Sequence, residues 1–236
     1  MTVGHALACP EIKRAILYLM TITVAAAAPE RLLVDTDCGY FGDDGTTLVM
    51  LLRAPEKVCV EAITIVTGNV WSAPSRGYVR EILSMLGESR IPMHMGADLP
   101  LRHTRAMSDE AQKKWGPLEF RGAFGEKRIA SRAKRDAVDE IIRRVEADPG
   151  QITIVALGPM TNIALALRKR PEIAGKIRRL VFMGGQFRVP GNASREAEFN
   201  FWFDPEAASE VLRAPIAEKV MFGLDVCNKA MLDKPG

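Results

Sequence analysis

The sequence predicts an α/β protein in one domain, built on an open, mostly parallel sheet with helices on both faces. Short apolar segments of strand length alternate along the chain with segments of helical periodicity. The 236 residues are 47% hydrophobic and 26% charged, enough for one domain with a substantial core. Polar residues and glycines recur directly after the apolar segments, as they do where α/β sheets bind ligands.

The first half of the chain supplies three expected strands and two helices. Residues 31–34 and 58–66 are apolar and β-branched, which predicts buried strands, and 91–95 are a shorter strand candidate. Residues 46–53 and 78–86 have helical spacing, the latter with an apolar face. Residues 97–130 are irregular and rich in Arg, Gly and Pro, so we expect a loop insertion at the rim of the sheet with one short helix.

The second half repeats the alternation. Strands are expected at residues 152–157, 180–183 and 219–222. Helices are expected at residues 133–147, 161–168 and 205–212, the first of them strongly amphipathic. Because parallel strands need crossover helices, this order favours a sheet covered on both faces.

The N-terminus has the pattern of a secretory leader. Lys13 and Arg14 precede an apolar run at 15–24, and four alanines and Pro29 follow it. A basic segment, a short apolar core and a small-residue cleavage site define a signal peptide, so we expect residues 1–28 to be removed and 29–236 to form the domain. The run is too short for a stable membrane anchor. The alternative is a buried first helix in a cytoplasmic protein.

Charge and cysteine content exclude other classes. A net charge of +3 is too small to indicate a nucleic-acid-binding protein. After the leader, Cys38, Cys59 and Cys227 remain, an odd number without regular spacing, so a disulfide framework is not expected.

The highest density of ionisable side chains is in an acidic loop directly after the first strand. Asp35, Asp37, Asp43 and Asp44 fall within ten residues. Like charges this close repel, so either their pKa values rise or a cation lies among them. Oxygen ligands without a nearby His or Cys favour Ca²⁺ or Mg²⁺ over zinc. The alternative is a solvated turn in which Asp43 or Asp44 caps the next helix.

The loop and four later segments resemble one family, the inosine–uridine-type nucleoside hydrolases. The stretch from Asp35-Thr-Asp-Cys-Gly to Asp43-Asp44 resembles the family's opening motif. The later matches follow in the family's order, over roughly residues 31–228: Ala62 to Asn69, Ala156-Leu-Gly-Pro-Met-Thr-Asn162, Met183-Gly-Gly with Gly191-Asn192 and Glu198-Phe-Asn200, and Gly223-Leu-Asp.

The resemblance implies hydrolysis of the N-glycosidic bond of ribonucleosides with a Ca²⁺-bound water. By that similarity, Asp37 is both a metal ligand and the general base, Asp44 is the main metal ligand, and the Leu157 carbonyl is a further ligand. Asp35 supports the loop. The positions matching those that hold the ribose are Asp43, Asn69, Asn192, Glu198 and Asn200. Carboxylates and amides suit this chemistry, because they stabilise an oxocarbenium-like sugar and bind its hydroxyls.

Family members supply one more acidic metal ligand near the C-terminus, next to a His in many cases. Here the late acids are Asp225 and Asp233, neither in the matching motif, and we interpret them as a strand-end residue and a tail residue. The histidines His5, His94 and His103 all lie upstream. We therefore expect a C-terminally incomplete domain with weak Ca²⁺ binding and reduced turnover. A homo-oligomer is compatible with this expectation.

Two alternatives remain at this stage. A strand ending in Asp35-x-Asp37 also resembles haloacid-dehalogenase-type Mg²⁺ phosphatases, although that leaves the 191–200 motif unexplained. The second alternative is a non-catalytic nucleoside- or ribose-binding paralogue. Tyr40, Trp71 and Trp202 could stack on a nucleobase or simply pack. Asn162 is interpreted as a helix-start residue and His103 as a loop residue.

Overall fold

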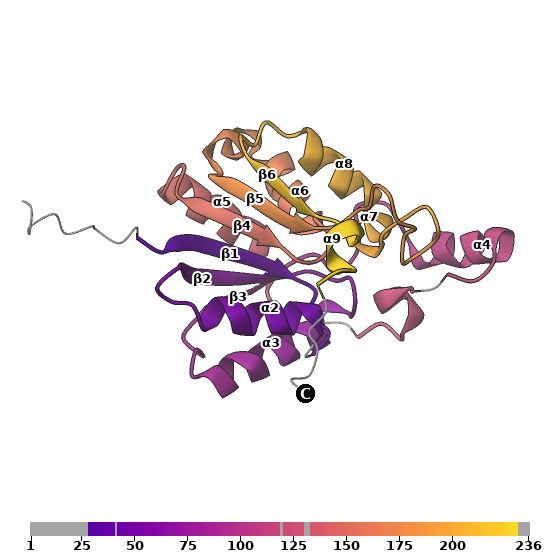
Figure 1. Ribbon diagram of the computed structural model, residues 1–236, viewed down its shortest axis with the longest axis horizontal. Coiled ribbons are helices and arrows are strands. Elements are labelled where there is room, and N and C mark those ends of the chain that lie inside the picture. Colours follow the sequence, from indigo (N-terminus) through magenta and orange to yellow (C-terminus); the bar gives the residue numbers. More distant parts are fainter. Residues whose placement is uncertain (1–27, 41, 119, 130–132, 231–236) are drawn as a thin grey trace, which may run out of the picture.

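Six parallel strands form one sheet at the centre of the molecule. A computed structural model describes residues 28–40, 42–118, 120–129 and 133–230. The strand order is β3-β2-β1-β4-β5-β6, and every neighbouring pair is parallel. The strands are β1 (Glu30–Thr36), β2 (Val58–Ile65), β3 (Met93–Met95), β4 (Ile152–Ala156), β5 (Arg179–Met183) and β6 (Lys219–Phe222). The chain runs outward from β1 to β3 and then returns to β4, so the strand order reverses between β1 and β4 (Figure 1).

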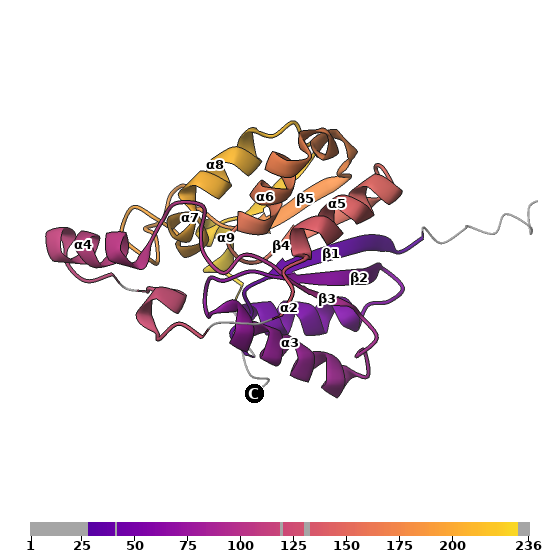
Figure 2. The ribbon, with the colours of Figure 1, turned by 180° about the vertical axis from the view of Figure 1, so that it is seen from behind.

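Helices pack on both faces of the sheet, as the sequence predicts. On one face lie α2 (Asp43–Leu52) and α3 (Ser72–Leu86), below β1 to β3 in Figure 1. On the other face lie α5 (Ala137–Ala147), α6 (Thr161–Lys169) and α8 (Pro205–Arg213), which Figure 2 shows in front of the strands. The sequence predicts this arrangement because each of these helices carries an apolar face and each strand is apolar.

The helix α4 and three short elements gather at the carboxyl ends of the strands. They are α4 (Arg105–Trp115), α7 (Phe199–Phe203), α9 (Leu224–Cys227) and the 3₁₀ turn η2 (Gly122–Gly125); a second 3₁₀ turn, η3 (Pro171–Lys176), lies between α6 and β5. Figure 1 shows α4 projecting beyond the strand tips. The region expected to be an insertion, residues 97–130, therefore contains α4 and η2 and extends the edge at which α/β sheets bind ligands.

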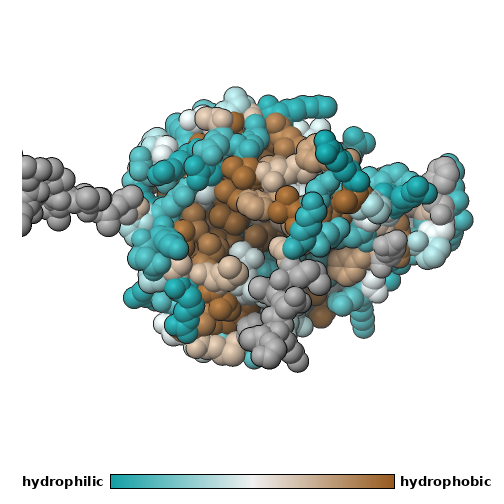
Figure 3. Space-filling model, in the orientation of Figure 1, coloured by the Kyte–Doolittle hydropathy of each residue, from teal (hydrophilic) through white to brown (hydrophobic). Residues whose placement is uncertain are grey.

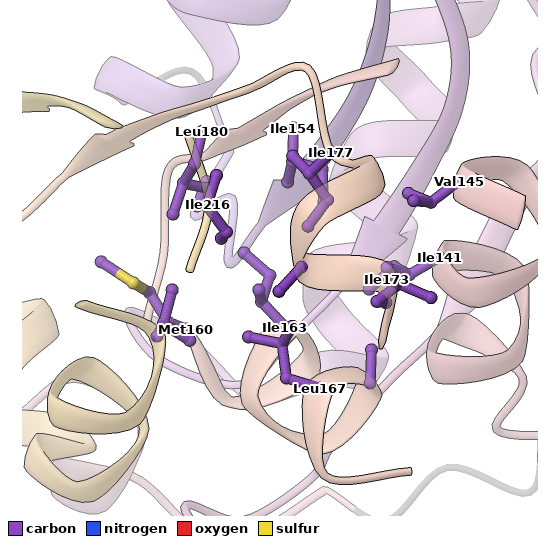
Figure 4. Close-up of a cluster of buried hydrophobic side chains, with 14 of the residues drawn as sticks. Ile141, Val145, Ile154, Met160, Ile163, Leu167, Ile173, Ile177, Leu180 and Ile216 are labelled. Atoms are coloured by element: carbon purple, nitrogen blue, oxygen red, sulfur yellow. The ribbon is translucent and has the colours of Figure 1, made fainter. Parts of the chain in front are cut away.

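The larger core fills the α5/α6/α8 side of the sheet. Alternate strand residues such as Ile152, Ile154 and Leu180 point there and are fully buried. Helix residues Ile141 and Ile163 meet them (Figure 4). A second cluster lies under α2 and α3 and includes buried residues of β1 and β2. Two cores separated by one sheet are the expected consequence of strands that are apolar on both faces.

On the α2/α3 side the helical cover is partial, because within the described residues it ends near β1 and β4. Leu180 and Phe182 of β5 are buried on the opposite face, whereas their neighbours Val181 and Met183 are only half-buried, and Phe222 of β6 is 45% exposed. Val181, Met183 and Phe222 line an apolar hollow of about 540 Å³. Figure 3 shows the corresponding brown surface over β4, β5 and β6.

Most expected elements are confirmed, with differences at their ends. Helix α3 begins at Ser72 rather than at residue 78, since Pro74 is tolerated in a first turn where it looks like a helix breaker in sequence. Helix α2 begins at Asp43, where acids favour the positive end of the helix dipole. The short elements α7, α9 and η3 had no periodic signal and were not expected. The predicted leader lies outside the described residues, and among the described helices none is long and apolar enough to span a bilayer.

Candidate functional site

The candidate site lies at the carboxyl ends of β1 and β4, where the strand order reverses. Asp35 is near the end of β1, and its backbone carbonyl accepts a 2.8 Å hydrogen bond from the Leu157 backbone N–H, just beyond β4. Asp37 comes after β1, Asn69 after β2 and Gly158 after β4, all at the same edge of the sheet. Open α/β sheets bind ligands at such points, because the loops on either side diverge there and leave room.

Asp35 is fully buried and held by neutral donors. Its Oδ1 accepts hydrogen bonds from the Thr64 hydroxyl at 2.5 Å and from the Asn162 amide at 2.7 Å, while its Oδ2 has no hydrogen-bond partner. Burial raises the pKa of Asp35 to about 7, against the lowering effect of the two donors. Asp35 therefore ties the start of the acidic loop to β2 and α6.

Asn162 joins three strand ends. Its Nδ2 donates to Asp35 Oδ1 and to the Ile65 carbonyl at 3.2 Å, and its Oδ1 accepts from the Ala97 backbone N–H at 2.7 Å. It lies in the first turn of α6, as expected, but its cross-linking role was missed. A fully buried amide inside the apolar segment Gly158 to Ala164 was the available signal, since such groups must find partners.

Asp37 is the most confined carboxylate of the site. It is fully buried, and its Oδ2 accepts a 2.5 Å hydrogen bond from the Asn69 backbone N–H. A Cβ added at Gly68 would lie 2.0 Å from Asp37 Oδ2, and one at Gly158 would lie 2.7 Å from Oδ1. Both glycines are therefore needed for the close approach of backbone to carboxylate. Burial, and next the charge of Asp44, raise the pKa of Asp37 well above its usual value.

Asp44 faces Asp37 from the first turn of α2. It is 5% exposed and accepts a hydrogen bond from the Thr36 hydroxyl. Burial, and then the neighbouring Asp43, raise the pKa of Asp44 to about 6. Asp43 itself is exposed at the start of the same helix. The sequence alternative of a solvated turn is therefore wrong for Asp44, which is buried, and compatible with Asp43.

The donor types at this point fit a hard cation. Asp37 Oδ1 is buried and has no hydrogen-bond partner, beside a second buried carboxylate whose charge it repels. The Leu157 carbonyl, at the end of β4, accepts one hydrogen bond and has a second lone pair. Ca²⁺ takes carboxylate and carbonyl oxygens of this kind. Within the described residues, however, no group of three or more His, Cys, Asp or Glu side chains converges as a metal site.

Two residues predicted to hold the sugar lie at the start of α7: Glu198 is its N-cap, and Asn200 lies in its first turn. Glu198 is 1% exposed, and its oxygens accept hydrogen bonds from the backbone N–H groups of Gly185, Asn200 and Phe201. Burial raises the pKa of Glu198 in spite of these three donors. The Asn200 Nδ2 donates to the Leu157 carbonyl at 2.8 Å, which ties α7 to β4.

The other two predicted amides border the same edge. Asn69 is half-buried, and its backbone holds Asp37. Asn192 is exposed, and its Oδ1 accepts from the Phe199 backbone N–H at 2.8 Å, so it positions the start of α7. Hydrogen bonds thus link Asp37 to Asn69, Leu157 to Asn200, and Asn192 to α7. The structure brings the residues of the separate motifs to one edge.

Trp71, Trp202 and Asp225 make their contacts outside the acidic loop. Trp71 is 3% exposed and packs against Phe124, so its role is packing. Trp202 is half-buried and lines a cavity of about 670 Å³ between α4 and residues 194–196. Asp225 lies just after β6 and accepts hydrogen bonds from the backbone N–H groups at 187 and 188, so its contacts are structural. Asp233 lies outside the described residues.

His103 and Tyr40 complete the candidate list. His103 Nδ1 lies 3.2 Å from the Phe203 carbonyl, and its ring meets Trp202 edge-to-face at 4.8 Å. Burial lowers the pKa of His103, which therefore favours the neutral ring. Tyr40 is 45% exposed, with a left-handed backbone at φ 66°, and its ring meets Tyr78 edge-to-face at 5.3 Å.

Comparison with known sequences gives one family. Residues 32–235 match the model of the family described as inosine-uridine preferring nucleoside hydrolase. The chain is 38% identical over 203 residues to the pyrimidine-specific ribonucleoside hydrolase RihA of Citrobacter koseri, covering 85% of this chain and 62% of the relative. It is 34% identical over 200 residues to an uncharacterized protein of Schizosaccharomyces pombe, covering 84% and 62%. The chain thus spans about 62% of the length of these curated relatives.

Solved structures agree. The fold matches a plant nucleoside hydrolase, PpNRh1, with a TM-score of 0.67 and 31% identity, covering 84% of this chain and 60% of the other. It also matches a purine-preferring ribonucleoside hydrolase from Gardnerella vaginalis, with a TM-score of 0.67 and 30% identity, covering 86% and 63%. The six-stranded parallel sheet described above is therefore a shared architecture.

Proposed function

The chain belongs to the inosine-uridine preferring nucleoside hydrolase family, and from this premise we propose that it hydrolyses the N-glycosidic bond of ribonucleosides to ribose and free base. The observation that carries the proposal is Asp37, a buried carboxylate with one oxygen held by Asn69 and the other without a hydrogen-bond partner. That free oxygen, Oδ1, is the atom that would take a proton from the attacking water. Family membership leaves the phosphatase alternative without support.

The residues around Asp37 suit the rest of the reaction. Asn69 and Asn200 lie on either side of the acidic loop and offer amide groups to sugar hydroxyls. Glu198, buried nearby, places a carboxylate where positive charge would develop on the ribose. Asp43, exposed at the start of α2, can reach a ribose hydroxyl from the solvent side.

We propose Ca²⁺ as the cofactor, held by Asp37, Asp44 and the Leu157 carbonyl. The support is the chemistry of these donors, two buried carboxylates and a carbonyl at the end of β4. A bound Ca²⁺ would lower the pKa of a water molecule and so supply the nucleophile. The protein residues would fix the position of that water and accept its proton.

The decisive experiment measures base release from inosine, uridine and cytidine by liquid chromatography, with Ca²⁺ present. We expect release by the wild-type protein and a loss of about 10²- to 10⁴-fold in Asp37→Asn, because the general base is removed. Asp139→Asn, which changes an exposed acid on α5, is the matched control and should retain activity. Absence of base release by the wild-type protein would overturn the proposal.

A second candidate is a protein that binds ribonucleosides without cleaving them. Its support is that no third acidic side chain joins Asp37 and Asp44 among the described residues. Calorimetry that detects inosine or uridine binding, together with no base release, would establish this alternative in place of the first.

We also propose that the protein is exported, to the periplasm or the medium. The support is the sequence pattern of residues 1–28 alone. Fusion of these residues to a periplasm-dependent reporter such as alkaline phosphatase should give an active, processed reporter. Retention of the uncleaved fusion in the cytoplasm would contradict export.

A further inference from the structure

The insertion between β3 and α5 reaches into the gap between the two loops that carry the proposed sugar-binding amides. We call residues 68–71, which include Asn69, the first arm, and residues 198–203, which include Asn200, the second arm. The two arms come from opposite halves of the sheet, after β2 and after β5. The turn η2 of the insertion contacts both of them.

Gly122 and Ala123 make the backbone contacts. The Ala123 N–H donates a 2.8 Å hydrogen bond to the Gly68 carbonyl, directly before Asn69. A Cβ added at Gly122 would lie 2.4 Å from that carbonyl oxygen and 2.4 Å from Cζ of the Phe199 ring on the second arm. Gly122 also has φ +52°, a conformation that favours glycine. The backbone of η2 is thus wedged between the arms without room for a side chain.

Phe124 makes the side-chain contacts. It is fully buried, and its ring centroid lies 4.6 Å from that of Phe203 on the second arm and 6.4 Å from that of Trp71 on the first. His103 meets the same ring edge-to-face at 5.4 Å. One aromatic side chain therefore touches both arms, and it fixes their separation because a close-packed contact resists compression.

The insertion is tied down near both of its ends. Asp98, at the start, is 8% exposed and accepts a 2.7 Å hydrogen bond from the Ser72 hydroxyl at the first residue of α3. Arg128, near the other end, bonds Asp98 at 2.8 Å, and its guanidinium lies 5.8 Å from the Trp71 ring centroid. These contacts hold η2 in the gap rather than leaving it as a free loop.

From these contacts we infer that Gly122 and Phe124 are positioning residues for substrate recognition, which set the distance between Asn69 and Asn200 across the ribose. The ring of Phe124 meets the arms at Trp71 and Phe203, neither of them a proposed metal ligand, so its effect falls on the placement of the sugar-binding amides. Gly122 abuts the Gly68 carbonyl, directly before the Asn69 N–H that binds Asp37, so a side chain there would also disturb that carboxylate. The inference rests on the proposed function, since it assumes that these amides hold the sugar.

The test uses two matched pairs in the full chain. Gly122→Ala is compared with Gly125→Ala, a neighbour in the same turn where an added Cβ meets only the Arg121 Cβ at 3.7 Å. Phe124→Leu is compared with Ile141→Val, a buried substitution on α5 far from both arms. Three quantities are measured for each variant: KM and kcat for inosine and uridine, or the calorimetric Kd if there is no turnover; terbium affinity by luminescence; and the melting temperature.

We expect Gly122→Ala and Phe124→Leu to raise KM or Kd about tenfold. Terbium affinity should stay within about twofold of wild type in Phe124→Leu, because amide placement changes while the carboxylates stay, and should fall in Gly122→Ala, which also displaces the backbone that binds Asp37. The control variants should keep wild-type KM even where their melting temperature falls as much. Equal effects in the variants and their controls, or equal losses of terbium and nucleoside affinity in Phe124→Leu, would overturn the inference alone. A wild-type protein that neither binds nor cleaves inosine and uridine would overturn the proposed function and this inference together. Phe124→Leu decides the matter if Gly122→Ala does not fold.

Discussion

Buried carboxylates occur at both ends of the central strands, in opposite electrostatic surroundings. Toward the amino ends, Glu61 of β2 and Glu140 of α5 are bonded by Arg31, Arg143 and Arg144. Burial alone would raise the pKa of Glu140, but the arginine hydrogen bonds outweigh it and hold that pKa at about 2. We call these five residues the arginine network.

At the carboxyl ends, Asp35, Asp37 and Asp44 are more deeply buried. Their pKa values are shifted by burial, by the charges of neighbouring aspartates, including Asp43, and by neutral donors. The pKa values rise instead of falling. Among the described residues, the acids at one end are thus paired with arginines, whereas no cationic side chain shifts the pKa values of those at the other end. Perturbed carboxylates in such a setting are typical of functional sites.

The largest expected effect comes from breaking the arginine network. Arg144 bonds Glu61 at 2.6 Å and Glu140 at 2.5 Å, and all three side chains are less than a fifth exposed. Arg144→Met leaves both acids short of a partner and should lower the free energy of unfolding by about 2–4 kcal/mol in urea titrations. The control Arg168→Met breaks an exposed pair with Glu210 and should cost less than about 1 kcal/mol. Equal losses in the two variants would show that the arginine network stabilises the fold no more than an exposed ion pair does.

The second effect is that of Ca²⁺ on the carboxyl end. Ca²⁺ at about 100 times its Kd should raise the free energy of unfolding by about 2.7 kcal/mol, because it binds the folded state alone. Asp37→Asn should lose this response, whereas Asp139→Asn should keep it. A wild-type response that persists in Asp37→Asn would place the cation elsewhere.

The third effect is a dependence on pH in the presence of a chelator. The folded-state pKa values of Asp35 and Asp44, about 7 and about 6, lie above the usual value of 3.8, so the folded state binds more protons and loses stability as the pH rises. The free energy of unfolding should be about 1–3 kcal/mol lower at pH 7.5 than at pH 5.5. Glu140 does not contribute to this change, since its stabilisation is present above about 4.5 and is lost only as the pH falls toward 2. Asp35→Asn should flatten the profile, and an unchanged slope in that variant would contradict the assignment.

The smallest expected effect is an increase in the stability of the metal-free protein. Asp44→Asn removes one buried charge beside Asp37 and keeps an oxygen to accept the Thr36 hydroxyl. Metal-free protein should become more stable by about 1 kcal/mol in urea titrations, while its stabilisation by Ca²⁺ disappears. The exposed neighbour serves as control, because Asp43→Asn should change metal-free stability by less than about 0.5 kcal/mol. A loss of stability in Asp44→Asn would show that its charge is already compensated.

Only the acidic cluster at the carboxyl ends of the strands could be predicted from the sequence. The acids at 35–44 follow a strand within ten residues, so their clustering and the repulsion among them were predictable. The arginine network was not, because Arg31, Glu61 and Arg144 are distant in sequence and meet only after β1, β2 and α5 pack. Glu61 lies where the β1–β2 register shifts, an irregularity without a local sequence signal.

The candidate site shows the same limit. Asp37 and Asn69 could be placed at strand ends by counting strands, whereas Asn200 was identified only by the resemblance of its motif. The contacts of Gly122 and Phe124 with the two arms could not be predicted, since residues 97–130 have no periodicity and these contacts depend on where the insertion folds back. Long-range packing decided these positions, and local patterns carry no information about it.

The partly uncovered face of β5 and β6 has a practical consequence for all these measurements. Environment-sensitive dyes such as anilinonaphthalene sulfonate brighten on exposed apolar surface, and that response is commonly taken as the mark of a molten globule. With Val181, Met183 and Phe222 accessible in the folded protein, such a dye should already be bright at low temperature. Dye-based melting curves would then begin from a high baseline, and circular dichroism is the method that reports unfolding of this protein directly.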